Sequence, residues 1–285
     1  MGEWLITITS IAREVAGAVK PLLGTAAARV DLGQGAGGDI TNQVDAIAED
    51  IIAKTLKATL LPIKLITEER GIVLLNCSDE NDVQYHAIVD PVDGSVNATR
   101  NLPFVATSIA IANGPTVADI TDGVVMNIST GDLYAASKGQ GAWLNDAPMA
   151  IEPVTRDLHE AIMGIDINPK SRSQPRSELV AEYACLMDAP KKVRILGSNA
   201  LETCLVAQGG LDCFLDIRGN LRLLDIAASW LVVEEAGGVF YHVEDGTTKD
   251  LDDLPLDTDS RLMVFASTCT ELWEAVEAAW PRGKV

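Results

Sequence analysis

The chain has 285 residues, of which 47% are hydrophobic, and its 41 acidic and 22 basic residues give a formal net charge of −19. This length and composition allow one large domain or two modest ones around a sizeable core. The acidic balance excludes an extended surface for nucleic acid or anionic membrane, because both need clustered lysine and arginine.

The cysteines and histidines indicate which compartment and which kind of metal site to expect. The five cysteines are scattered without a CxxC pair, and the three histidines show no spacing typical of zinc ligands. The chain does not open on a leader-like segment, and it lacks an apolar run of roughly 18 residues. We therefore expect a cytoplasmic protein with reduced thiols and no membrane partner, in which carboxylates hold any metal as a hard cation.

The N-terminal part is expected to begin with two helices. Apolar residues at helical spacing predict an amphipathic helix from Glu3 to Leu23. A glycine-rich loop, Gly33–Gly38, follows and lacks the lysine of a Walker motif. Residues 39–42 then offer N-caps for a second helix that should reach about Leu61. In its first turn, Asp45 is either a functional acid or simply an acid favoured by the helix dipole.

Two predicted strands after these helices end in acidic residues. A strand over 63–66 leads to Glu68 and Glu69, and a strand over 85–89 leads to Asp90-Pro91-Val92-Asp93. Ligands of open sheets collect at such strand ends, and closely spaced acids suit magnesium. Asp-Pro and Asp-Gly are also common turn dipeptides. Residues 94–97, however, can surround an anion with backbone N–H groups, as helix N-termini do.

The rest of the chain is predicted to form an antiparallel sheet, followed by a part in which strands and helices alternate. Period-two alternation from Phe104 to about Leu144 predicts an antiparallel sheet with tight hairpins. A polar, proline-bearing stretch at 148–157 predicts a boundary between an α+β subdomain, 1–153, and an α/β subdomain, 154–285. The second subdomain is expected to contain strands at 161–167, 192–196, 211–217, 239–243 and 262–266. Its expected helices lie at 174–187, 198–208 and 224–236, and a terminal helix follows the last strand and reaches Trp280.

Four segments, in order, resemble the motifs of one family, the inositol monophosphatase superfamily of magnesium-dependent, lithium-inhibitable phosphatases. They are a helix-start motif at Asp39–Asp45, a Glu-Glu motif at Ile66–Glu69, a DPxDGT-like signature at Asp90–Ser95, and a D-x-A-A motif at Leu224–Ser229. The resemblance implies an α+β fold in which five layers form an αβαβα sandwich. It also implies a homodimer.

The resemblance also implies a metal site with two or three magnesium ions. Its ligands would be Glu68, Asp90, the Val92 carbonyl, Asp93 and Asp225, with Asp90 bridging two of the ions. A third ion would lie near Glu68, with Asp45 as a further candidate neighbour. The chemical reason is charge: a phosphate dianion would be repelled by this many carboxylates unless cations lie between them.

Catalysis is implied to be in-line attack on phosphorus by a magnesium-activated water, without a covalent intermediate. By resemblance, Ser95 and Asp45 orient and deprotonate this water, and Glu68 belongs to the catalytic set. Ser95 stands where most relatives carry threonine and keeps the hydroxyl. The phosphate would rest on the N–H groups of Gly94, Ser95 and Val96.

The expected substrates are small sugar or polyol phosphates. Val96 and the long segment 215–222 look like the archaeal branch of the family, whose members often hydrolyse both inositol 1-phosphate and fructose 1,6-bisphosphate. Further substrate contacts implied by the resemblance are Asp93, Gly197, Ser198, Asn199 and Asp216. Arg194, Arg218 and Arg222 are candidates for a distal phosphate, or else ordinary surface or ion-pair arginines.

Two alternatives remain open at this point. One is a relative that removes phosphate from 3′-phosphoadenosine 5′-phosphate or NADP, which would need an adenine slot near Gly197. The other is a catalytically silent phosphate-binding homologue. Loss of Glu68, Asp90, Asp93 or Asp225 would favour the silent homologue, and all four are present.

Overall fold

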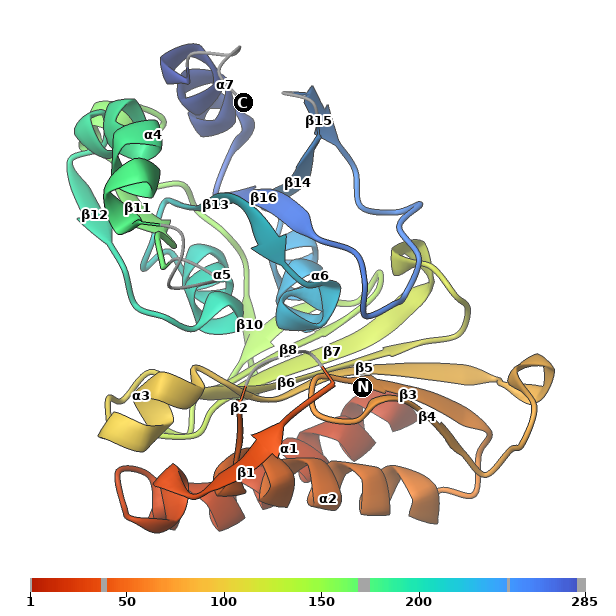
Figure 1. Ribbon diagram of the computed structural model, residues 1–285. Helices are drawn as coiled ribbons and strands as arrows, with labels where there is room; N and C mark the ends of the chain where they lie inside the picture. The colour runs from red at the N-terminus through yellow and green to blue at the C-terminus, as the bar shows by residue number, and fades with distance from the viewer. Residues whose placement is uncertain (1, 37–39, 169–174, 245–246, 281–285) are drawn as a thin grey trace.

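The computed structural model describes residues 2–36, 40–168, 175–244 and 247–280, which form five layers (Figure 1). Helices α1 and α2 cover one face of an eight-stranded sheet, and α5 and α6 lie between this sheet and a six-stranded one. Helices α4 and α7 cover the outer face of the smaller sheet. The predicted αβαβα sandwich is thus confirmed. The helices are α1 Glu3–Val19, α2 Gln43–Ala58, α3 Ser95–Arg100, α4 Arg176–Asp188, α5 Asn199–Gln208, α6 Ala227–Glu235 and α7 Thr270–Ala279.

The large sheet has the order β10-β9-β8-β7-β6-β5-β3-β4. Only β3 and β5 pair in parallel, so the antiparallel sheet predicted from period-two alternation is present. The edge strands β4 and β10 were not predicted. The strands are β3 Ile63–Thr67, β4 Gly71–Leu75, β5 Tyr85–Asp93, β6 Ala106–Ala112, β7 Ile120–Asn127, β8 Leu133–Ser137, β9 Gly141–Leu144 and β10 Ala147–Met149.

The small sheet has the order β12-β11-β13-β16-β14-β15 and is mixed. Its β12, β11 and β13 are parallel and connected through α4 and α5, whereas β13, β16, β14 and β15 pair antiparallel. The strands predicted at 239–243 and 262–266 are therefore present as β14 and β16, but the pattern did not indicate their antiparallel pairing, and β15 was not predicted. The strands are β11 Ile162–Ile165, β12 Lys192–Arg194, β13 Cys213–Leu221, β14 Val239–Glu244, β15 Thr247–Lys249 and β16 Leu262–Ser267.

The first two helices form where predicted but end earlier. In α1, residues three apart such as Leu5, Ile8 and Ile11 are buried against the sheet. The α-helix ends at Val19 and continues only as a 3₁₀ turn, since Pro21 has no N–H group. Helix α2 begins after the N-cap Asn42 and ends at Ala58.

The glycine-rich segment before α2 is not simply a loop. Gly33 belongs to β1, Asp31–Gln34, which pairs antiparallel with β2, Ile40–Asn42. Gly37, Gly38 and Asp39 of the predicted loop and helix-start motif lie outside the described residues, as does the predicted start of α4 at Gln174. Within the described residues, no helix is long and apolar enough to cross a membrane.

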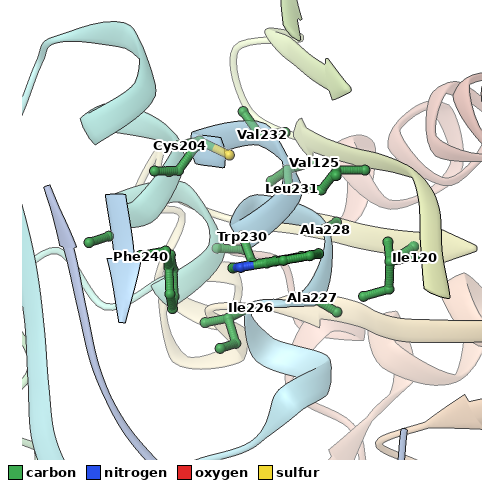
Figure 2. Close-up of a cluster of buried hydrophobic side chains, with 14 of the residues drawn as sticks. Ile120, Val125, Cys204, Ile226, Ala227, Ala228, Trp230, Leu231, Val232 and Phe240 are labelled. Carbon is green, nitrogen blue, oxygen red and sulfur yellow. The ribbon is translucent and has the colours of Figure 1, made fainter. Parts of the chain in front are cut away.

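Helix α6 is buried from both sides because it lies between the two sheets. Figure 2 shows its Trp230 and Val232 among side chains of β7, α5 and β14. Gly123 of β7 permits the closest approach, since a Cβ there would lie 3.1 Å from both Cα and the carbonyl oxygen of Ala228. Glycine opposite alanine therefore lets the helix pack directly on the sheet backbone. This contact fixes the start of α6 and, with it, the preceding Asp225.

Candidate active site

A cleft of about 870 Å³ opens where the carboxyl ends of β3 and β5 meet the second half of the chain. It gathers most of the predicted site residues from segments far apart in sequence. Those from the first half include Glu68, Glu69, Asp90, Val92, Asp93, Gly94, Ser95 and Val96. Those from the second half include Asp166, Asn168, Gly197, Asn199, Arg222 and Asp225.

The acidic C-terminal end of β5 is the floor of this cleft. The strand continues through Asp93, but its register with β6 shifts between Asp90 and Asp93. The Asp90 carboxylate accepts a hydrogen bond from the Val92 N–H at 3.1 Å. Gly94 then turns the chain into α3 with φ +89°, and a Cβ there would lie 3.0 Å from the Phe104 carbonyl oxygen. Glycine is therefore required at this position.

The carboxylates of the cleft share an unfavourable electrostatic environment. Burial, with the nearby charges of Glu68, Asp93 and Asp225, raises the pKa of Asp90 well above its ordinary value. Burial also raises the pKa of Glu68 to about 8 and that of Asp93 to about 7, with Asp225 adding to both. These acids can all ionise near neutral pH only if positive charge is added.

Arg222 supplies one such charge. Its Nη2 donates to Glu68 Oε1 at 2.6 Å and to Asp225 Oδ1 at 3.0 Å, and its backbone N–H donates to Asp225 Oδ2 at 2.8 Å. Burial disfavours the charged guanidinium, but the charges of Asp225 and Glu68 outweigh it and raise the pKa of Arg222 above its ordinary value. A guanidinium thus lies between two of the predicted metal ligands.

Hydrogen bonds join the floor of the cleft to the second half of the chain. Asp93 Oδ2 accepts from the Ser198 hydroxyl at 2.6 Å and from the Ala200 N–H at 2.8 Å. The Asn97 amide of α3 donates to the carbonyl of Leu196 at 2.8 Å. The buried Glu202 carboxylate accepts from the backbone N–H groups of Leu196 and Gly197. The segment 196–200 is therefore held from both sides.

Asp45 and Ser95 lie together, as the resemblance implied. The Ser95 hydroxyl is 3.3 Å from Asp45 Oδ1 and 3.0 Å from the Val92 carbonyl oxygen. Asp45 Oδ2 accepts from the Asn42 N–H at 2.7 Å, which also caps α2. Burial of Asp45 raises its pKa to about 7, and the nearby Glu69 adds to this effect. The pair thus combines a hydroxyl with a carboxylate that can exchange a proton near neutral pH.

The predicted substrate contacts separate into two groups. Gly197 and Asn199 line the cleft, whereas Ser198 is buried beneath it against Asp93. Asp216 is fully buried and accepts hydrogen bonds from Arg218, and Arg194 lies on β12 outside the lining.

The structure also shows a cleft residue that was not predicted. Asp166 lies directly after β11, lines the cleft, and pairs with Arg218 at 2.7 Å. An acid at the end of a strand was the available signal, the same one that marked Asp90. Asn168 beside it donates to Asp166 through its backbone and its side chain.

The fit of a metal depends on the donors and on their arrangement. Carboxylates and a backbone carbonyl are the oxygen ligands that a hard cation prefers, and buried carboxylates with raised pKa values gain most from a nearby cation. As the side chains stand, however, the described residues contain no group of three His, Cys, Asp or Glu side chains that could hold a metal ion. Glu68 and Asp225 instead face Arg222. The donor set fits magnesium chemically, but Glu68 and Asp225 would have to turn away from Arg222 to hold it.

The chain belongs to the inositol monophosphatase family. The family's model matches residues 2–280, which confirms the resemblance drawn from the motifs.

Among its relatives is a fructose-1,6-bisphosphatase/inositol-1-monophosphatase of Methanothermobacter thermautotrophicus. It is 37% identical over 280 residues, which cover 96% of this chain and 95% of the relative. A bifunctional NADP phosphatase/NAD kinase of Methanococcus maripaludis is 30% identical over 90% of this chain, which spans only 46% of that protein.

Solved structures agree with this placement. A Pyrococcus horikoshii protein with similarities to inositol-1 monophosphatase has a TM-score of 0.79 at 26% identity, covering 97% of each chain. The extragenic suppressor protein SuhB of Bartonella henselae has a TM-score of 0.81 at 25% identity, covering 99% of this chain and 100% of that one.

Proposed function

We propose that the protein is a magnesium-dependent phosphomonoester hydrolase that acts on small sugar or polyol phosphates such as inositol 1-phosphate and fructose 1,6-bisphosphate. The observation that carries the proposal is the convergence of Glu68, Asp90, Asp93 and Asp225 on one cleft beside the Asp45–Ser95 pair. The relative from Methanothermobacter, similar over nearly its full length, bears the names of both activities.

The substrate phosphate would be held at the start of α3. The first N–H groups of a helix have no acceptor within the helix, and Gly94, Ser95 and Val96 line the cleft. Glu68, Asp90, Asp93, Asp225 and the Val92 carbonyl would hold two or three magnesium ions. These ions supply the positive charge and Lewis acidity that phosphoryl transfer needs.

Ser95 and Asp45 would handle the proton of the attacking water. A water beside the Ser95 hydroxyl can pass a proton to that oxygen while the hydroxyl proton moves to Asp45 Oδ1, 3.3 Å away. Asp45 suits this role because burial raises its pKa to about 7, near the pH at which a general base is most effective. Asn42 holds the second oxygen of this carboxylate, which fixes its orientation.

The side of the cleft that Asp166 and Asn168 line would select the substrate. Asp166 and Asn168 present polar atoms that can accept or donate hydrogen bonds to polyol hydroxyls. Arg218 is paired with Asp166 and with Asp216, and so orders this side of the cleft.

A second candidate is phosphate removal from NADP or 3′-phosphoadenosine 5′-phosphate. Two observations favour it: the similarity to the Methanococcus maripaludis bifunctional protein, and the exposed side chains of Leu102 and Ile195 in the cleft lining. An apolar rim of this kind can pack against a nucleobase.

Phosphate release tests both candidates. The four substrates are inositol 1-phosphate, fructose 1,6-bisphosphate, NADP and 3′-phosphoadenosine 5′-phosphate, each with magnesium and with EDTA. We expect magnesium-dependent release that is fastest from one of the first two. Faster release from the nucleotides would favour the second candidate. No release from any of them would leave a silent phosphate-binding homologue and overturn the hydrolase proposal.

A further inference from the structure

The guanidinium of Arg222 occupies the space between two carboxylates that come from opposite halves of the chain. Glu68 follows β3, and Asp225 precedes α6, yet one nitrogen of Arg222 lies within 3.0 Å of both. The arginine side chain is only 13% exposed, and Glu68 and Asp225 are 12% and 9% exposed. This is a partly desolvated ion-pair network and not a solvated surface contact.

The backbone of Arg222 is held by a hydrogen bond, whereas its side chain borders the cleft. Its N–H group donates to Asp225 Oδ2 at 2.8 Å and starts the 3₁₀ turn Leu223–Asp225. Arg222 lines the cleft, so a turn of its side chain into that space would release the carboxylates without a change in the fold. Asp225 can therefore keep its backbone contact while the oxygen that faces Nη2 becomes available.

We propose that Arg222 is an internal counter-ion that competes with the divalent cation for Glu68 and Asp225. This inference rests on the proposed magnesium dependence. In the metal-free protein, the guanidinium donates hydrogen bonds to Glu68 and Asp225 and orders the two side chains. When magnesium binds, the guanidinium leaves them, because two cations at such short range repel each other strongly. The competition explains why the four acids line one cleft without already forming a closed metal site.

The competition makes Arg222 a residue that sets metal affinity. Its charge lowers the affinity for magnesium, since part of the binding free energy is used to displace the guanidinium. The same charge protects the metal-free cleft from repulsion among its carboxylates. Removal of the charge should therefore change metal affinity and metal-free stability in opposite directions.

Isothermal titration with magnesium chloride tests this on the full chain. Arg222→Met keeps the length of the aliphatic stem without the charge, and Arg194→Met is the matched control, because Arg194 lies outside the cleft lining. We expect Arg222→Met to bind magnesium at least tenfold more tightly than wild type and to melt at a lower temperature in EDTA. Arg194→Met should show wild-type affinity. Equal or weaker magnesium binding by folded Arg222→Met would overturn the inference.

A second measurement uses wild-type protein alone. In ¹⁵N spectra of the arginine side chains, the Arg222 Nε–H signal should be protected in EDTA and should shift or exchange rapidly once magnesium is saturating. A signal that magnesium leaves unchanged would overturn the inference. Wild-type protein that binds no magnesium in the titration would instead refute the proposed metal dependence, so the two failures are distinguishable.

Discussion

The Ser198 hydroxyl donates to Asp93 Oδ2 at 2.6 Å, although 105 residues separate the two. The same oxygen accepts from the Ala200 N–H in the first turn of α5. The carboxylate therefore lies at the positive end of a helix from the second half of the chain. The second half thus orients a proposed metal ligand that the first half supplies.

Replacement of Ser198 by alanine should loosen this orientation. We expect the free energy of unfolding to fall by about 1–2 kcal/mol, because a buried carboxylate loses one hydrogen bond and keeps those from α5. Magnesium affinity and kcat should both fall several-fold, measured by titration and phosphate release. Ser260→Ala, at an unrelated turn where Ser260 bonds to Asp257, is the control and should leave both unchanged. Wild-type magnesium affinity in Ser198→Ala would contradict the orienting role.

Asp93→Asn should abolish turnover without unfolding the protein. Asp93 is only 7% exposed, but asparagine keeps an oxygen that can accept from Ser198 and Ala200. It loses the negative charge that a cation needs. Circular dichroism should therefore match wild type, while phosphate release drops to background. Unchanged activity would show that the metal ligands are assigned incorrectly.

The metal-free protein should lose stability as pH rises. Burial raises the pKa of Glu68 from 4.5 to about 8 and that of Asp93 from 3.8 to about 7. Between about pH 4.5 and 8, the folded protein therefore binds protons that the unfolded chain has already released, and stability falls with increasing pH.

Melting temperatures in EDTA from pH 5 to 8.5 would measure this fall. Magnesium should restore the loss at high pH, because it binds the folded protein. Asp93→Asn, which lacks one of the titrating acids, should show a shallower fall. A melting temperature in EDTA that stays level or rises over this range would contradict the prediction.

Local patterns predicted the elements that hold the first half of the site. The apolar spacing of α1 and the alternation of β6 to β8 follow from burial on one face, which a sequence displays directly. Helix α2 was predicted from the N-cap residues that precede it. The acids after β3 and β5 were predicted from their position at strand ends. The edge strand β4 was missed because half-exposed residues such as Val73 and Leu74 give no clear alternation.

Contacts between distant segments could not be predicted in the same way. Arg222 stands three residues before Asp225, but nothing local shows that its side chain reaches Glu68, 154 positions earlier. The pairing of Asp216 with Arg218 could have been predicted from the local sequence, because residues two apart on a strand share a face. The role of Glu202 in holding the cleft segment had none, because its partners are backbone groups brought close by the turn before α5.

Asp45→Asn tests the proposed proton acceptor. Asparagine can still accept from the Asn42 N–H and cap α2, but it cannot take a proton through Ser95. We expect kcat to fall by about 100-fold or more, within the range for loss of a general base. In wild type, kcat should rise with pH up to about 7, where Asp45 becomes ionised. Bound cations would shift this rising limb of the pH profile to lower pH. The variant should lack the limb altogether.

The control is Asp50→Asn, the same chemical change on the same helix. Asp50 pairs with Arg70 on the exposed side of α2 and lies outside the cleft lining. Its kcat and pH dependence should match wild type. An Asp45→Asn enzyme that keeps both the rate and the pH limb of wild type would place the general base elsewhere. Glu69 would be the next acid to test, because it also lines the cleft and its charge raises the pKa of Asp45.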